Sequence, residues 1–278
     1  MALFLYFGMI LFLVGINCSG NDASVAALGL FVAATLTGRL SGGHFNMAIT
    51  FAVYVVEGKW RKNLFIALLV AAVDLLGAFT AMAISAGLLG KKNVFTLIPP
   101  GEINNYTNSY LMYLLLVEAF FTMIFVSTVL SVKYRKVSAT SDGMLSNLTV
   151  AIGLYVVVRM AGPLSGGGVN PTIGIASIVT GAIIFNYDDD SSKYVNPIFL
   201  VPYICGPLLG ALMAAGISKL ATRIYDEEEE DENMMNRART TTQEEVFNAR
   251  AGNSSINGDS EQFMMLDGDR RSTSKRTR

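Results

Sequence analysis

The sequence predicts an all-α membrane protein with six transmembrane helices, two shorter re-entrant half-helices and an inverted three-span repeat. Three observations predict this class. Of the 278 residues, 52% are hydrophobic and only 15% are charged, whereas a soluble domain has about 25% charged residues. The apolar residues gather in runs of about the 20 residues that cross a bilayer. A short motif of Ser, Gly and Asn also occurs twice.

Six long apolar segments are the expected spans: 2–19, 23–40, 63–89, 109–132, 144–162 and 195–222. The first resembles a secretory signal but lacks the positively charged start and the cleavage pattern of one. Two further apolar segments, 46–57 and 170–185, are too short to cross a bilayer. Unwound backbone at membrane depth is tolerated only where protein covers it or water reaches it. The short segments therefore predict a wet cavity.

Short basic clusters set the expected orientation, and they lie at 59–62, 133–136 and 219–223. With six spans, all three fall on one side of the membrane, which the positive-inside rule makes cytoplasmic. We therefore expect an integral protein of a plasma or vacuolar-type membrane with both termini in the cytoplasm. The loop 90–108 then lies outside and carries a glycosylation sequon at Asn105.

The two halves of the chain repeat each other. ALGLFV at 27–32 matches AIGLYV at 151–156, and SGGHFN matches SGGGVN at the same offset of 124 residues. Because three spans are an odd number, the second copy enters from the opposite face of the membrane, and its special site is expected near the midplane. Asn46 and Asn170 should therefore meet there.

These repeats define the expected domain organisation. The membrane domain covers residues 1–222, with one repeat at about 2–89 and the other at about 109–222. Residues 223–278 form a tail that opens with an acidic run at 226–232 and ends in basic and polar residues. Blocks of like charge with few apolar residues predict a disordered cytoplasmic tail.

Each SGGxxN motif reads as extended backbone, an asparagine cap and a short helix. The asparagine oxygen accepts a bond from an unpaired N–H of the first helical turn, and Pro171 suits the first helical position after Asn170. The preceding residues can present carbonyl acceptors to a narrow path, while the asparagine NH₂ groups supply donors. These pore-lining backbone residues are Gly42, Gly43, His44, Gly166, Gly167 and Gly168.

Two half-helices that point their N-termini at one spot place two partial positive charges there. A cation or a hopping proton would meet an electrostatic barrier in such a low-dielectric passage. A neutral molecule would meet only donors and acceptors.

Composition argues against several other classes. The net charge of −1 gives no reason to expect a nucleic-acid partner. Two cysteines, Cys18 and Cys205, and the single histidine His44 fit neither a disulfide framework nor a metal site. No nucleophile, acid–base pair or metal cluster indicates an enzyme, and we expect no cofactor.

The two motifs give the chain a resemblance to the aquaporin, or major intrinsic protein, family. Residues 41–48 and 165–172 stand where that family has its paired Asn-Pro-Ala boxes, and Glu118 and the GPLLGA stretch at 206–211 add further matches. The resemblance implies a pore in each subunit of a homotetramer embedded among membrane lipids. It also implies passive transport of water or small neutral solutes.

The chain departs from the family within both boxes. Met47 replaces the proline of the first box, and Thr172 replaces the alanine of the second. The residues expected at the pore centre are Asn46, Met47, Ala48, Asn170, Pro171 and Thr172. A larger departure is Ile173, which stands where the family has the arginine of its outer selectivity filter.

The other filter positions implied by the resemblance are Val158, Gly167 and either Leu28 or Ala26. Such a filter is apolar. Either the pore accepts solutes larger than water, or another residue restores the constriction. Arg159 is the candidate for that role, and snorkelling of Arg159 to the membrane interface is an equally weighted interpretation.

Two buried-looking carboxyl groups remain, and a buried charge must be paired or protonated. Glu118 matches a family carboxylate that holds a pore loop, and Asp74 stands where the family usually has glutamine. We interpret both as supports for the loops, with proton relay as the less favoured role.

The sequence thus predicts a channel for water or small uncharged solutes. The apolar filter leaves open an aquaglyceroporin-like pore that favours glycerol or urea. Two competing hypotheses are an ion-coupled carrier and a junction or scaffold protein with a vestigial pore.

Overall fold

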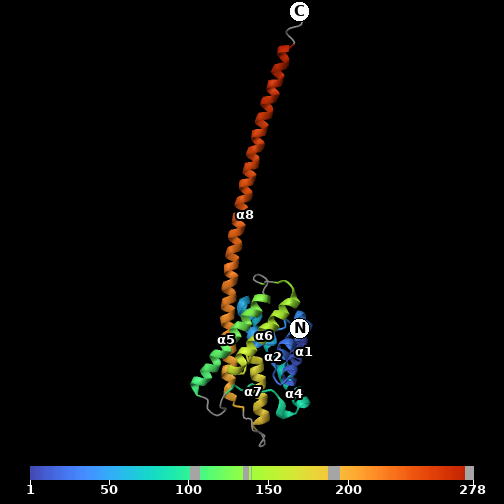
Figure 1. Ribbon diagram of the computed structural model, residues 1–278, viewed down its shortest axis with the longest axis vertical. Coiled ribbons are helices and arrows are strands. Elements are labelled where there is room, and N and C mark those ends of the chain that lie inside the picture. The colour runs from blue at the N-terminus through green and yellow to red at the C-terminus, as the bar shows by residue number, and fades with distance from the viewer. Residues whose placement is uncertain (101–106, 134–137, 139, 187–194, 273–278) are drawn as a thin grey trace, which may run out of the picture. The chain divides into compact units, whose positions relative to one another are not determined.

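The computed structural model describes residues 1–100, 107–133, 138, 140–186 and 195–272. The described residues form helices and loops, which agrees with the predicted all-α class (Figure 1). The α-helices are α1 (Ala2–Cys18), α2 (Ala23–Ser41), α3 (Met47–Glu57), α4 (Trp60–Leu89), α5 (Asn108–Lys133), α6 (Gly143–Ser165), α7 (Pro171–Phe185) and α8 (Leu200–Ser272). Two short 3₁₀ helices are η1 (Lys91–Asn93) and η2 (Pro197–Phe199). The sequon at Asn105 lies outside the described residues.

The helix lengths match the expected division into spans and half-helices. Helices α2, α4, α5, α6 and the apolar start of α8 are long and apolar enough to cross a membrane. Helix α1 has 17 residues, which is at the lower end of the range for a span. Helices α3 and α7 have 11 and 15 residues, so neither crosses a bilayer alone.

Helices α2 and α6 begin and end in the same way in the two halves. Asp22 caps α2 by accepting from the backbone of Ser24 and Val25, and Asp142 caps α6 by accepting from Met144 and Leu145. Hydrogen bonds hold the pKa of both carboxyl groups below the ordinary value. The largest contribution comes from the Ser24 hydroxyl for Asp22 and from the Leu145 N–H for Asp142. Both caps therefore stay charged at neutral pH.

Glycines bring the last helix of each half close to the first. A Cβ on Gly77 of α4 would lie 3.0 Å from the Tyr6 carbonyl oxygen of α1. A Cβ on Gly210 of α8 would overlap the Ala119 carbonyl of α5. Small residues allow membrane helices this approach, so the two halves pack alike.

The chain divides into two compact units, Met1–Thr222 and Arg223–Arg278. Within the second unit the backbone is helical through Ser272, whereas the sequence predicted disorder. Arg223 and Glu227 form an i,i+4 ion pair at 3.0 Å, and Glu, Arg, Gln and Met favour helix. Side chains 227–246 are exposed, so local propensity and backbone bonds account for this helix.

Candidate functional site

The loops before α3 and α7 share an unusual backbone. Left-handed conformations recur at equivalent places in the two loops, 124 residues apart: Gly42, Gly43 and Phe45, then Gly166, Gly167 and Val169. Glycine adopts such conformations readily, but phenylalanine and especially β-branched valine rarely do. The surrounding structure must therefore impose this conformation. The conformation places the end of each loop at the start of its half-helix.

Asn46 and Asn170 cap the two half-helices. The Oδ1 atom of Asn46 accepts from the Ala48 N–H at 2.8 Å, and that of Asn170 accepts from the Thr172 N–H at 3.0 Å. Both side chains are buried. Each cap satisfies one of the unpaired donors of a helix start.

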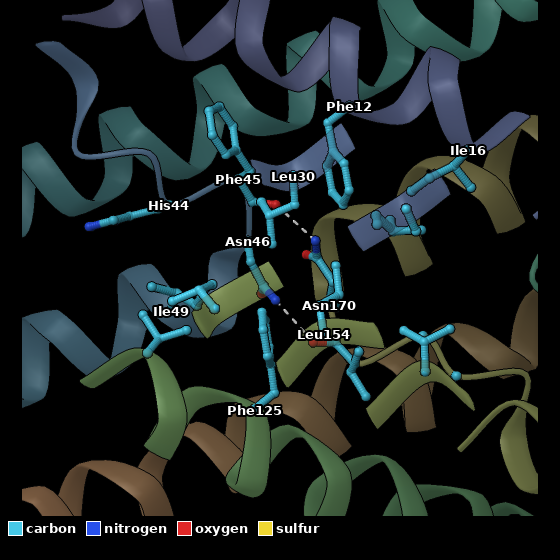
Figure 2. Close-up of a pocket in the computed structure, with 18 of the residues that line it drawn as sticks. Phe12, Ile16, Leu30, His44, Phe45, Asn46, Ile49, Phe125, Leu154 and Asn170 are labelled. Carbon is cyan, nitrogen blue, oxygen red and sulfur yellow. Dashed lines mark hydrogen bonds between the residues drawn. The ribbon is translucent and has the colours of Figure 1, made fainter. Parts of the chain in front are cut away.

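The same two side chains join the halves to each other. Asn46 Nδ2 donates to the Val169 carbonyl oxygen at 3.0 Å, and Asn170 Nδ2 donates to the Phe45 carbonyl oxygen at 2.8 Å (Figure 2). The two asparagines thus meet, at a distance of 124 residues in sequence. An amide nitrogen carries two N–H groups, so each asparagine keeps one donor beyond this bond.

Asn46 and Asn170 line a cavity of about 50 Å³. Because a buried water needs roughly 10–15 Å³ on the same measure, the cavity has room for a few waters. Figure 2 shows Asn46 and Asn170 between His44 on one side and Ile16 on the other. Its lining includes residues at equivalent places in the two repeats: Ala26 with Val150, Leu30 with Leu154, Ala34 with Val158, Gly43 with Gly167, and Ile49 with Ile173.

Ile173, Val158 and Gly167 line the cavity together with Phe95 and Leu97. We call this part of the lining the Ile173 mouth. These lining side chains carry no charge.

The sequence analysis missed Phe95 and Leu97, which follow η1. Their segment is held by the Phe95 N–H, which donates to Asn17 Oδ1 at 2.9 Å. Asn17 is 2% exposed and also donates to the Leu13 carbonyl oxygen. A lone amide at the end of an apolar span was the signal that could have indicated this anchor.

Two expected filter residues point away from the cavity. Leu28 is 60% exposed, and Ala26 lines the cavity in its place. Arg159 is exposed and is absent from the lining, whereas its neighbour Val158 lines it. Successive residues of a helix point about 100° apart, so only one of two neighbours faces a narrow path. Arg159 therefore lies outside the lining of this cavity.

A second part of the lining, which we call the His44 mouth, contains Gly43, His44 and Lys133. The His44 Nδ1 atom lies 3.1 Å from the Thr50 hydroxyl oxygen. Lys133, the only charged side chain among the described lining residues, donates to Asn147 Oδ1 at 3.3 Å. The sequence analysis used Lys133 only for orientation. The described residues hold no metal-binding cluster.

Glu118 supports the loop before α7. Its Oε1 accepts from the Ser165 hydroxyl at 2.6 Å and the Gly168 N–H at 3.1 Å, and its Oε2 accepts from the Val169 N–H at 2.6 Å. The Tyr203 hydroxyl donates to the Ser165 carbonyl oxygen. Glu118 is fully buried, so these bonds fix the loop that carries Val169 to the asparagine pair.

Asp74 does not match this arrangement. It is fully buried, and neither of its carboxyl oxygens has a hydrogen bond among the described residues. The Asn46 backbone N–H lies near this carboxyl group but does not form a hydrogen bond with it. Asp74 therefore lies at the loop before α3 but holds it far less firmly than Glu118 holds the second loop.

The fold and the site together define a membrane channel built on two opposed half-helices. Sequence comparison agrees, because the major intrinsic protein family model matches residues 2–218 and 119–248. The chain therefore belongs to the major intrinsic protein family, whose membership indicates an integral membrane channel for water or small solutes and not an enzyme.

Individual relatives are distant. The chain is similar to aquaporin PIP2-4 of Zea mays, with 27% identity over 74% of this chain and 71% of the relative. It is 26% identical to aquaporin NIP1-1 of Zea mays over 73% of this chain and 65% of that one. The aquaglyceroporin structure from Plasmodium falciparum aligns with a TM-score of 0.62 at 15% identity, over 81% of this chain and 97% of the other. At that identity the alignment shows a shared fold.

Proposed function

We propose that this protein is a passive channel for water and other small neutral solutes that excludes ions and protons. The observation that carries this proposal is the asparagine pair. Two capped half-helix N-termini meet beside a cavity that has room for a few waters, and each asparagine keeps a free donor there.

The electrostatics of this arrangement support neutral solutes. The N-terminus of a helix carries roughly half a positive charge, and both half-helices begin at the cavity. A cation would lose its hydration shell and meet like charge in a medium of low dielectric constant. A water molecule exchanges its hydrogen bonds for amide donors and carbonyl acceptors, so it crosses at lower cost.

The choice among neutral solutes rests on the Ile173 mouth. A cavity of about 50 Å³ suits water. Glycerol or urea is the second candidate, because Ile173, Val158 and Phe95 offer an apolar wall without the charge and donors of an arginine. Such a wall suits the carbon side of a polyol and does not compete for its hydroxyl groups.

Swelling of proteoliposomes in parallel gradients of water, glycerol and urea tests the function. We expect water flux well above that of lipid alone, without dependence on an ion gradient. Flux that requires an ion gradient would support a carrier instead. No flux for any of the three solutes would favour a scaffold with a closed pore.

A matched pair of substitutions on α2 tests the path. Ala26→Trp places a large ring in the cavity, and we expect it to abolish flux for every solute. Leu28→Trp changes a side chain that points away from the cavity, so flux should persist. Equal loss in both variants would contradict the assigned path.

We further propose that the chain forms homotetramers in a plasma or vacuolar-type membrane with both termini in the cytoplasm. The positive clusters and the family membership support this arrangement. Cross-linking in native membranes followed by sizing would test the number of subunits.

A further inference from the structure

The two residues that depart from the family boxes contact each other. The backbone N–H of Met47, the first residue of α3, donates to the hydroxyl oxygen of Thr172, the second residue of α7, at 3.2 Å. Thr172 is completely buried. Neither residue lines the cavity, so the contact joins the two half-helix tips behind the conduit.

The repeat relates this donor and acceptor to a second pair of positions, which contains neither an N–H donor nor a hydroxyl acceptor. Pro171 occupies the place of Met47, 124 residues on, and has no N–H. Ala48 occupies the place of Thr172, 124 residues back, and has no hydroxyl. The donor and the acceptor therefore occur only where they can pair with each other.

The pairing answers a need that the proline-to-methionine change creates. A methionine at the first helical position carries an N–H that proline lacks, and the first N–H groups of a helix have no partner within it. Met47 is half-buried and the facing Thr172 is fully buried, and a donor shielded from water without an acceptor is costly. The Thr172 hydroxyl supplies that acceptor.

We infer that Met47 and Thr172 are a coupled pair of positioning residues, in which the Thr172 hydroxyl compensates for the Met47 N–H and holds the two half-helix tips together. The pair thereby fixes the positions of Asn46, which directly precedes Met47, and of Asn170, which lies two residues before Thr172. This contact positions the two half-helix tips whichever solute crosses the site.

Four variants test the coupling, with thermal unfolding of the purified full-length protein in detergent as the measurement. Thr172→Val removes the hydroxyl at constant shape and should lower the Tm by about 2–10 °C. Thr172→Ser keeps a hydroxyl and should retain most of the wild-type Tm.

In the Met47→Pro background the N–H is gone, so Thr172→Val should lower the Tm little. The backbone accepts this proline, because Asn46 is extended at ψ 118°, close to the 109° of Asn170 before Pro171.

Thr122→Val is the matched control, because the Thr122 hydroxyl is buried and has no hydrogen bond among the described residues. It should leave the Tm unchanged or raise it slightly. An equal loss from Thr172→Val in both backgrounds, or no loss in the wild type, would overturn the inference. If Thr172→Val alone fails to fold, folding of the double variant supports the coupling and failure of both overturns it. Because unfolding is measured without transport, these outcomes do not depend on the proposed function.

Discussion

At the scale of single residues, Ile173 has the largest consequence for what the channel passes. It lies 8% exposed in the lining of the mouth, at the family position of the filter arginine. The side chain narrows the path by bulk alone and offers no donor to a solute. If the proposed function holds, we expect selection at this mouth to depend on size and polarity and not on charge.

We expect Ile173→Arg to lower the permeability for glycerol and urea relative to water, because the longer side chain fills the mouth and binds solvent. Parallel swelling assays in the three solutes measure the ratio. Ile173→Leu conserves volume and serves as the control. A rise of the glycerol-to-water ratio in the arginine variant would contradict the assigned filter.

The two buried carboxyl groups differ at the same scale. Both oxygens of Glu118 accept hydrogen bonds, from Ser165 and from the backbone of Gly168 and Val169. The oxygens of Asp74 have no such bond among the described residues. Glu118 and Asp74 are therefore equally buried, but only Glu118 is hydrogen-bonded to a loop.

Glu118→Gln is expected to destabilise the protein by about 2 kcal/mol, because the amide turns one acceptor into a donor that faces an N–H group. Asp74→Asn should cause no loss, since it removes a buried carboxyl group without hydrogen bonds. Denaturant unfolding in detergent compares the two. A larger loss in the Asp74 variant would reverse this assignment.

At the scale of elements, helix packing depends on where glycines fall. Gly210 of α8 lies against the Ala119 carbonyl of α5, whereas a Cβ on Gly216 would meet open space. The sequence analysis could not separate the two, because helical spacing alone does not give the rotation of a helix.

Gly210→Ala should lower stability by about 1–3 kcal/mol, because the new methyl group forces α8 away from α5. Gly216→Ala should be neutral or slightly stabilising, since alanine favours helix. Thermal unfolding of both variants in detergent decides. A harmless Gly210→Ala substitution would show that the two helices do not approach this closely.

The sequence predicted the helix order, the half-helices and the all-α class well, because runs of apolar residues and the repeated motif are local signals. It did not predict which side of α2 faces the cavity, where Ala26 and not Leu28 lies. It also missed Phe95 and Lys133, and the contact between Met47 and Thr172. These features depend on the rotation of each helix about its axis and on contacts between loops and spans that are distant in sequence. A local sequence pattern does not encode either of them.

At the scale of the whole molecule, the orientation of the chain is open to a direct test. The predicted topology puts the end of α1 on the outer face, and Cys18 at this end is an exposed free thiol. The other cysteine, Cys205, can be removed.

In a Cys205→Ser background, a membrane-impermeant maleimide should label Cys18 on intact cells, because the thiol faces the external medium. Labelling of permeabilised cells gives the total, and the Cys18→Ser variant gives the blank. Labelling that appears only after permeabilisation would place this end, and with it the Ile173 mouth, in the cytoplasm.

The hydrogen bonds from Asn46 to the Val169 carbonyl and from Asn170 to the Phe45 carbonyl make the two copies of the repeat depend on one another. Each copy provides the carbonyl that accepts from the amide of the other. Loss of either half would leave the buried amide of the other without its carbonyl acceptor.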